Sequence, residues 1–543
     1  MFGHFLASSL ICLASFAVIG TDDDTPAPPE SFSQAQREHW SFQPVLRPDI
    51  PNTRERDWSR NPIDLFILAN LETLDITPSP EADRIALIRR VTYDLIGLPP
   101  TPEEVAEFVH DNRPDAYERL VDRLLASPQH GVRWAQHWLD LAHYADTNGF
   151  ELDAERPDAW RYRDWLVKAL NDDMPYDRFL ALQIAGDEVG PGDHAALIAS
   201  GFARSGPREV VAGNIDPKVR RQNELTEVTG TVGSVFLGLT LACARCHDHK
   251  FDPIPTTDYY RLQSFFAAAQ YVEVPIATQE EEEAHNKEKK AVEAKMAPFK
   301  KQLGELEAPY RKTLKAEKER LLTEVEREVL KISAKDRSPA QRKIAEGAAT
   351  HLMVRWEEVA EAVAHDPEVQ AERERLKRAI FEIERTLPRP PAKAMALADR
   401  DRQAPKTFVF RRGEIKNVGP LVAPRPPGIL LMEGAFCADS IQPTEQTTGR
   451  RKALAEWLTR PDHPLTARVL VNRVWQHHFG RGIVATPSDF GVRGELPSHP
   501  ELLDWLAREF VDSGWKLKAL HRLVVTSATY RQASNTKHGT HAD

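Results

Sequence analysis

The segment from residue 241 to residue 254, LACARCHDHKFDPI, holds two of the four cysteines of the 543-residue chain. Cys243 and Cys246 are two residues apart in the spacing C-x-x-C, and His247 follows directly. In a C-x-x-C-H motif each thiol can add across a vinyl group of haem, and the histidine can then bind the iron. With four cysteines and 19 histidines in the chain, chance would produce the motif in roughly one such sequence in a thousand. The motif therefore predicts covalently attached haem c, held by Cys243 and Cys246, with His247 as ligand of the haem iron.

Two alternatives remain open for the same residues. The thiol and imidazole groups of Cys243, Cys246, His247 and His249 also suit zinc or iron, with His249 as an added metal ligand. A single C-x-x-C lacks the second ligand pair of a structural zinc module, although distant residues could supply it. A local disulfide between Cys243 and Cys246 would suit an exported protein, but it would leave His247, His249 and Asp252 unexplained.

A second group of polar residues lies between residues 143 and 165. Asp146, Asn148, Arg161 and Asp164 are candidate catalytic residues there, because polar groups this dense after an amphipathic helix can line a cleft. The competing interpretation is a buried network of ion pairs that anchors a loop.

A second axial haem ligand has several candidates, namely His137, His143, Met174, His477 and His478. Adjacent residues on a helix point about 100° apart, so we expect at most one of His477 and His478 to face a given site.

Apolar residues at helical spacing predict a mainly α fold, with two helical domains separated by a charged helical arm and a small β-containing, proline-rich linker. The predicted parts are a signal peptide at 1–20, a flexible linker at 21–40, a helical domain with the C-x-x-C-H motif at 41–277, the charged helical or coiled-coil arm at 278–387, the proline-rich linker at 388–445, a second helical domain at 446–534 and a disordered tail at 535–543.

Four local patterns sharpen this outline. Thr101, Pro102 and Glu104 predict a capped helix start. Residues 224–242 predict an apolar helix that leads straight into Cys243, and residues 406–414 predict a strand. In the arm, Pro298 and Pro309 predict interruptions of the helical pattern.

Composition and charge narrow the class of protein. Charged residues make up 28% of the chain and hydrophobic residues 41%, as in soluble globular proteins. The net charge of −10 argues against nucleic-acid binding, which needs a basic face. No internal run reaches the ~18 apolar residues of a membrane span. The apolar residues 5–20, followed by an acidic segment, predict export to the periplasm or the extracellular space.

Two long stretches resemble known families. The runs RWAQHWLDLAHYADTNGFELDAERPDAWRYRDW and FLGLTLACARCHDHKFDPIPTTDYYRLQSFF resemble the planctomycete cytochrome-like domain, a PSCyt-type domain of unknown function. The tail that begins HPLTARVLVNRVWQHHFGRG resembles its usual companion, the planctomycete-specific secreted domain, a PSD-type domain of unknown function. Together the resemblances cover about residues 40–280 and 445–534, and they imply an exported protein.

The sequence differs from these relatives in two respects, and it shares with them a run that continues after His247. Relatives often carry a separate cytochrome c domain and continue beyond TSATYRQAS, whereas this sequence has no second C-x-x-C-H and stops soon after that run, as a short or truncated member would. The family pattern runs on from His247 through His249, Lys250, Phe251, Asp252 and Pro253. Haem attachment requires nothing beyond His247, so the extension implies a second role, as a metal site or a catalytic group.

The expected function is that of an exported c-type haem-like protein that transfers electrons to a periplasmic redox partner or supports oxidative chemistry, with His249 and Asp252 orienting the imidazole or a substrate. One alternative is a periplasmic metal- or acid/base-dependent enzyme acting on a polysaccharide-like substrate. It would use His249, Asp252 and the residues from Asp146 to Asp164, with the cysteines as a disulfide or metal clamp. The other is a surface-assembly protein that binds a protein partner through the charged arm. Whether the protein is an enzyme stays open.

Overall fold

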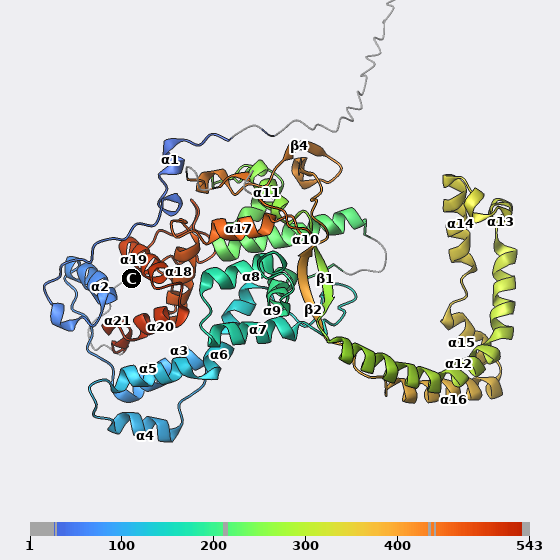
Figure 1. Ribbon diagram of the computed structural model, residues 1–543, viewed down its shortest axis with the longest axis horizontal. Coiled ribbons are helices and arrows are strands. Elements are labelled where there is room, and N and C mark those ends of the chain that lie inside the picture. Colours follow the sequence, from blue (N-terminus) through green and yellow to red (C-terminus); the bar gives the residue numbers. More distant parts are fainter. Residues whose placement is uncertain (1–26, 28–29, 210–214, 433–435, 439–440, 535–543) are drawn as a thin grey trace, which may run out of the picture. The chain divides into compact units, whose positions relative to one another are not determined.

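The computed structural model describes residues 27, 30–209, 215–432, 436–438 and 441–534 (Figure 1). The predicted signal peptide, residues 21–26 and 28–29 of the predicted flexible linker and the tail at 535–543 lie outside these residues. The chain divides into two compact units, one of residues 1–274 and 394–543, the other of residues 275–393. In the described part both units are mainly helical, which confirms the predicted mainly α fold. None of the helices described is long and apolar enough to cross a lipid bilayer.

The first unit is built from helices that precede and follow the arm. They are α1 (Gln34–Arg37), α2 (Pro62–Thr73), α3 (Arg84–Ile96), α4 (Pro102–His110), α5 (Ala116–Ala126), α6 (Pro128–Leu141), α7 (Trp160–Asn171), α8 (Tyr176–Val189), α9 (His194–Ala199), α10 (Pro217–Val232), α11 (Thr256–Gln263), α17 (Arg450–Leu458), α18 (Thr466–Phe479), α19 (Pro500–Asp512), α20 (Leu517–Val525) and α21 (Ala528–Arg531). The predicted capping box is present at α4, where the Thr101 side chain accepts from the Glu104 backbone and the Glu104 side chain from the Thr101 backbone.

Short strands accompany these helices. β1 (Ala269–Pro275) pairs with β2 (Lys393–Asp399), and β3 (Thr407–Phe410) pairs antiparallel with β4 (Val418–Val422) across a bulge. The strand predicted at 406–414 is therefore present as β3.

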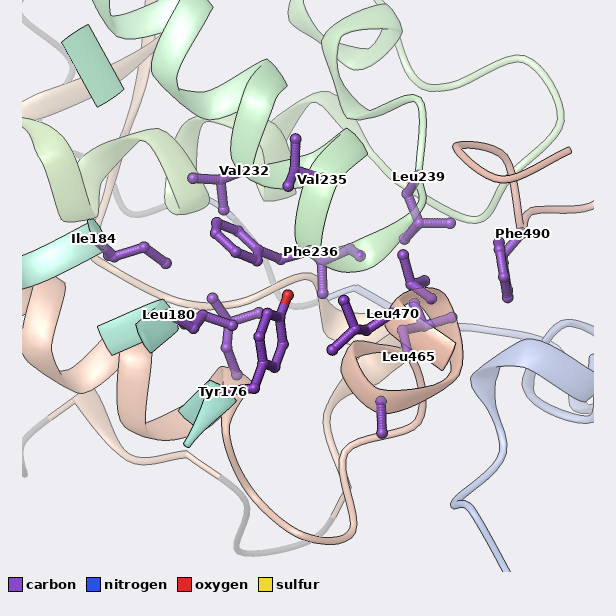
Figure 2. Close-up of a cluster of buried hydrophobic side chains, with 14 of the residues drawn as sticks. Tyr176, Leu180, Ile184, Val232, Val235, Phe236, Leu239, Leu465, Leu470 and Phe490 are labelled. Atoms are coloured by element: carbon purple, nitrogen blue, oxygen red, sulfur yellow. The ribbon is translucent and has the colours of Figure 1, made fainter. Parts of the chain in front are cut away.

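The two segments predicted as separate helical domains pack together in one unit. α17 packs on α8, α18 packs on α20, and α20 packs on α5 (Figure 1). Figure 2 shows apolar side chains of α8, such as Leu180, meeting Phe236 and, from the C-terminal segment, Leu470 in one cluster. A buried ion pair reinforces this packing, because the Arg451 guanidinium lies 2.7 Å from Asp187 Oδ2 and 2.8 Å from Asp399 Oδ1. Residues on both sides of the arm thus share one core.

The second unit is the charged arm. Its helices are α12 (Gln279–Leu321), α13 (Glu324–Lys331), α14 (Pro339–Leu352), α15 (Trp356–Ala364) and α16 (Pro367–Glu384). α12 packs on α16, where buried Glu307 accepts hydrogen bonds from Arg373 and Arg311. The predicted interruptions at Pro298 and Pro309 are wrong, because α12 continues through both prolines. Both prolines lie on the exposed face of the helix, where water can solvate the carbonyl groups that lose their N–H partners.

The chain between α10 and the cysteines also differs from the prediction. α10 ends at Val232 and continues as one π-helical turn, η4 (Gly233–Leu237), and Gly238 then adopts a left-handed conformation with φ of 58°. A Cβ atom on Gly233 would come within 2.7 Å of Leu241, so this glycine allows the chain to fold back closely. The helix predicted to lead straight into Cys243 therefore breaks five residues before it, and a separate 3-10 turn, η5 (Leu241–Arg245), carries the first cysteine.

Candidate functional site

The cysteine turn, residues 241–252, presents its reactive groups to solvent. Cys243, Cys246 and His247 are all exposed, and the two thiols are not joined in a disulfide. His247 Nδ1 lies 2.7 Å from the backbone carbonyl oxygen of Asp248. Since a carbonyl can only accept, Nδ1 donates this bond, and Nε2 keeps its lone pair for another partner.

Two neighbouring elements hold the turn in place. The Tyr260 hydroxyl, on α11, lies 3.0 Å from the carbonyl oxygen of Arg245 and 3.3 Å from that of Phe410 on β3. After β3, Gly413 has φ of 72°, and a Cβ atom there would come within 2.7 Å of Cys246 Sγ. The absence of a side chain at this glycine therefore lets the β3–β4 hairpin pack against the second cysteine.

His249 and Asp252 point inward, away from the exposed cysteines. Their side chains are only 7% and 2% exposed. His249 Nδ1 accepts from the backbone N–H of Asp252 at 2.8 Å, and Nε2 lies 3.0 Å from Thr240 Oγ1. Asp252 Oδ1 accepts from the backbone N–H of Val492 at 2.7 Å, and burial raises the pKa of this carboxyl. Both ring nitrogens of His249 are therefore used in the fold, which favours a structural role for these candidates over acid/base chemistry.

The rest of the extension after His247 attaches the turn to the C-terminal segment. A Cβ atom on Gly491 would collide with the carboxylate of Asp252. Next to this contact, the Phe251 ring lies 5.2 Å from Lys250 Nζ and 5.0 Å from Arg493 Cζ. Phe251 and Asp252 thus dock onto the loop around Gly491, which gives this part of the extension a packing role.

The polar residues between 143 and 165 form local contacts. Asn148 accepts from Arg156 Nε at 2.9 Å, and the same guanidinium donates to the carbonyl oxygens of Ser205 and Gly206 at 2.7 Å each. Asp146 accepts from the Tyr144 hydroxyl at 2.7 Å. The other two candidates lie in ion pairs, Arg161 with Asp158 at 3.1 Å and Asp164 with Arg163 at 2.8 Å. Asn148 thus takes part in the loop anchor through Arg156, whereas Asp146 and Asp164 are exposed and Arg161 pairs with a residue three positions away.

Three of the candidate axial ligands lie together elsewhere, in what we call the histidine cluster: His130, His137, His477, His478 and His521. The five rings surround Trp134 on α6, with ring centroids 3.9 to 6.3 Å from the indole. His137 and His477 stack at 3.7 Å, and His478 Nε2 lies 3.0 Å from His521 Nδ1. The expectation that only one of His477 and His478 faces a given site is wrong here, because the indole is wide enough for both rings to contact it.

Burial governs the protonation of this cluster. His130 and His521 are each 1% exposed. Desolvation lowers the pKa of His130 to about 4 and holds that of His521 well below its ordinary value. The Asp94 carboxylate lies 3.7 Å from His478 Nδ1, and it also accepts a hydrogen bond from the Tyr530 hydroxyl at 2.6 Å. Desolvation also lowers the pKa of His137 to about 3 and that of His477 to about 4, so burial favours the neutral form of these four imidazoles, and the cluster serves as a packing element.

The remaining candidates, His143 and Met174, belong to neither of these groups. His143, at φ of 56°, pairs with Glu227 at 3.0 Å, which raises the pKa of the imidazole. Met174 packs beside a small apolar group around Leu182.

The cysteine turn carries the donor groups that covalent attachment of haem would use. Two accessible thiols and an imidazole with an available Nε2 lie on one short segment. The side chains that flank them, Arg245, Asp248 and Lys250, are charged, so the turn itself contributes no apolar wall. Within the described residues, no group of three or more His, Cys, Asp or Glu side chains converges as a metal-ion site.

Two protein-family models match segments of the chain. Residues 62–271 match the family model PSCyt2, described as a protein of unknown function (DUF1549), and residues 450–543 match PSD1, described as a protein of unknown function (DUF1553). The chain joins a PSCyt2 domain to a PSD1 domain. No curated protein and no solved structure matches the chain. The cysteine turn lies in the PSCyt2 domain and docks through Asp252 onto the PSD1 domain, while the histidine cluster takes residues from both.

Sequence reasoning missed His130, Trp134 and His521 as members of a site. The spacing of His130, Trp134 and His137 at intervals of four and three places them on one face of a helix, and this signal could have been used. Nothing in the sequence marks His521 as their neighbour, because only the packing of α20 on the PSCyt2 helices brings it there.

Proposed function

We propose that the protein is an exported c-type haem protein that transfers electrons or supports oxidative chemistry outside the cytoplasm. The observation that carries the proposal is the exposure of Cys243, Cys246 and His247 on one turn, with His247 Nδ1 bonded to a backbone carbonyl. Thioether attachment requires thiols that are accessible and not oxidised to a disulfide, and these thiols meet both conditions.

Each residue has a defined part in the proposal. Cys243 and Cys246 would hold the haem through two thioether bonds, and because each bond would arise by addition of S–H across a vinyl group, attachment would consume no oxidant. The hydrogen bond from His247 Nδ1 orients the ring and leaves Nε2 for the iron. When bound, haem would supply reversible one-electron chemistry. Gly413 and Tyr260 fix the turn that carries these groups.

The test uses the full chain produced together with the c-type haem-attachment machinery. A pyridine haemochrome spectrum is expected to show thioether-linked haem, and Cys243→Ala/Cys246→Ala is expected to abolish covalent attachment. Cys437→Ala, which changes a cysteine outside the motif, is the matched control and is expected to retain the haem. A folded wild-type protein that carries no covalent haem would overturn the proposal.

The alternatives then give different results. Stoichiometric zinc or iron by elemental analysis, lost in the double cysteine variant, would favour the metal alternative. Loss of both thiols to titration in the exported protein would favour the disulfide. For the enzyme alternative, His249 and Asp252 are engaged in the fold, so acid/base chemistry would need other residues.

A further inference from the structure

A groove of about 870 Å³ lies within the second unit, where the end of α12 meets the end of α14 and the start of α15. Leu314 and Leu321 of α12 line it, together with Leu322, the residue that follows this helix. His351 lines it from α14. Neither the haem proposal nor any candidate residue from the sequence uses this groove.

Four large apolar side chains around this junction are exposed. Leu321, the last residue of α12, is 83% exposed. Val325 in the first turn of α13, Met353 after α14 and Trp356 at the start of α15 are each at least 60% exposed. Large apolar side chains that are exposed together, rather than scattered singly, mark contact sites for other molecules.

The backbone that presents these side chains is fixed. Lys318 Nζ lies 2.7 Å from Glu358 Oε1 and donates to the carbonyl oxygen of Met353 at 2.9 Å, so α12 is tied to both ends of the α14–α15 connection. α15 also packs on α12, and its residues Val359 and Val363 are buried. The groove is therefore formed before anything binds, which lowers the entropy that a partner must overcome.

The distribution of charge along the chain favours contact between two arms. Residues 275–393 contain 24 acidic and 25 basic residues, a net charge of +1, whereas the rest of the chain carries a net charge of −11. Two copies that met through their first units would bring strong like charge together. Two arms meet without this repulsion.

The groove also keeps unpaired groups of both signs. Among the described residues, Glu317, Arg355 and Glu357 line the groove and form no ion pair. In a two-fold contact the same patch is used on both copies, so the patch must be complementary to itself. An apolar centre flanked by one free guanidinium and two free carboxylates meets this requirement.

From these observations we infer that the groove binds the same groove of a second copy of this chain, so that the protein forms a two-fold dimer through its arms. Leu321 and Trp356 of both copies fill the apolar centre, and Arg355 of each copy pairs with Glu317 or Glu357 of the other. Trp, Met and Arg are enriched at such contacts, which suits Met353 as well. The inference is independent of haem attachment, since the cysteine turn takes no part in it.

The experiment is sedimentation velocity of the full chain over a series of concentrations from nanomolar to high micromolar. The wild type is expected to show a reversible monomer–dimer equilibrium. Leu321→Glu and Trp356→Glu are each expected to raise the dimer dissociation constant at least tenfold, because each places a carboxylate in the apolar centre. Phe381→Glu, which makes the same change at an exposed aromatic residue of α16 outside the groove, is the matched control and should dimerise as the wild type does.

A charge exchange tests the pairing separately. Arg355→Glu is expected to weaken the dimer, and combination with Glu357→Arg or with Glu317→Arg should restore it in at least one of the two double variants, because each copy then again offers both signs.

A wild type that stays monomeric at every concentration would overturn the inference. So would a dimer that Phe381→Glu weakens as much as Trp356→Glu does, since the contact would then lie elsewhere. The substituted side chains are exposed, and circular dichroism checks that each variant keeps its helices. Cys243→Ala/Cys246→Ala leaves the groove intact, so a dimer in that variant separates this inference from the haem proposal.

Discussion

The cysteine turn and the histidine cluster both gather imidazole groups, but they do so in opposite surroundings. On the turn, a hydrogen bond to the Asp248 carbonyl oxygen holds the His247 ring, and this exposed imidazole and the two thiols stay accessible. In the cluster, His130 and His521 are buried around an indole, and desolvation keeps them neutral. The same side chain is thus available to a ligand in one place and serves as an aromatic packing element in the other. Residue type indicates what chemistry is available, and burial decides whether it is used.

Acid should affect the cluster far more than the turn. The pKa values of His130 and His521 are lower in the folded protein than in the unfolded chain, where they are about 6.5. Proton uptake therefore favours unfolding: this contribution to stability is complete above pH 6.5 and is lost as the pH falls toward the folded-state values. His130 is expected to cost about 2 kcal/mol between pH 7 and pH 5, and His521 adds a cost in the same direction.

The measurement compares urea unfolding of His130→Gln, His521→Gln and the wild type between pH 7 and pH 5. The comparison with wild type is needed because buried Glu188 and Asp258 have pKa values raised to about 7 and about 6, and they titrate in the opposite sense. His130→Gln should gain about 2 kcal/mol relative to wild type on acidification, and His521→Gln should change in the same direction. His247→Gln serves as the exposed control and should match the wild type at pH 7 within about 0.5 kcal/mol. A gap between variant and wild type that does not change with pH would show that the cluster accepts protons freely.

The buried side of the cysteine turn, formed by His249 and Asp252, is expected to tolerate little change. Gly491→Ala places a methyl group against the Asp252 carboxylate, and we expect a loss of about 1–3 kcal/mol in the free energy of unfolding. Gly304→Ala is the control, because a Cβ atom at that exposed position on α12 meets open space, and the better helix propensity should stabilise the arm by about 1 kcal/mol.

A second variant assigns the loss to this contact. If the collision is with Asp252, Asp252→Ala combined with Gly491→Ala should be less destabilised than the sum of the two single variants. Strictly additive losses would mean that the docking of the turn onto the PSD1 loop does not depend on this contact.

The sequence allowed the helices and the cysteine motif to be predicted, because both are local. Helical spacing and the Thr101–Glu104 capping box act within a few residues, and they predicted α4 correctly. The break at Gly238 was missed, because it depends on packing against Val469 and Phe490, more than 200 residues away. The docking of Asp252 could not be predicted for the same reason, since its partner is Val492.

Substitution of the exposed cysteines should hardly change the free energy of unfolding, although it should remove the thiol reactivity of the turn. Cys243→Ser/Cys246→Ser changes two exposed side chains that form no disulfide, so the free energy of unfolding should stay within about 0.5 kcal/mol of the wild type. In protein made without haem, the same variant should lose two thiols that react rapidly with a disulfide reagent in the native state, because a thiolate must be exposed to attack. A stability loss as large as that of Gly491→Ala, or thiols that react only after unfolding, would place the cysteines in the packing of the turn. The contrast with the histidine cluster would then disappear, and so would the main support for ligand attachment at Cys243 and Cys246.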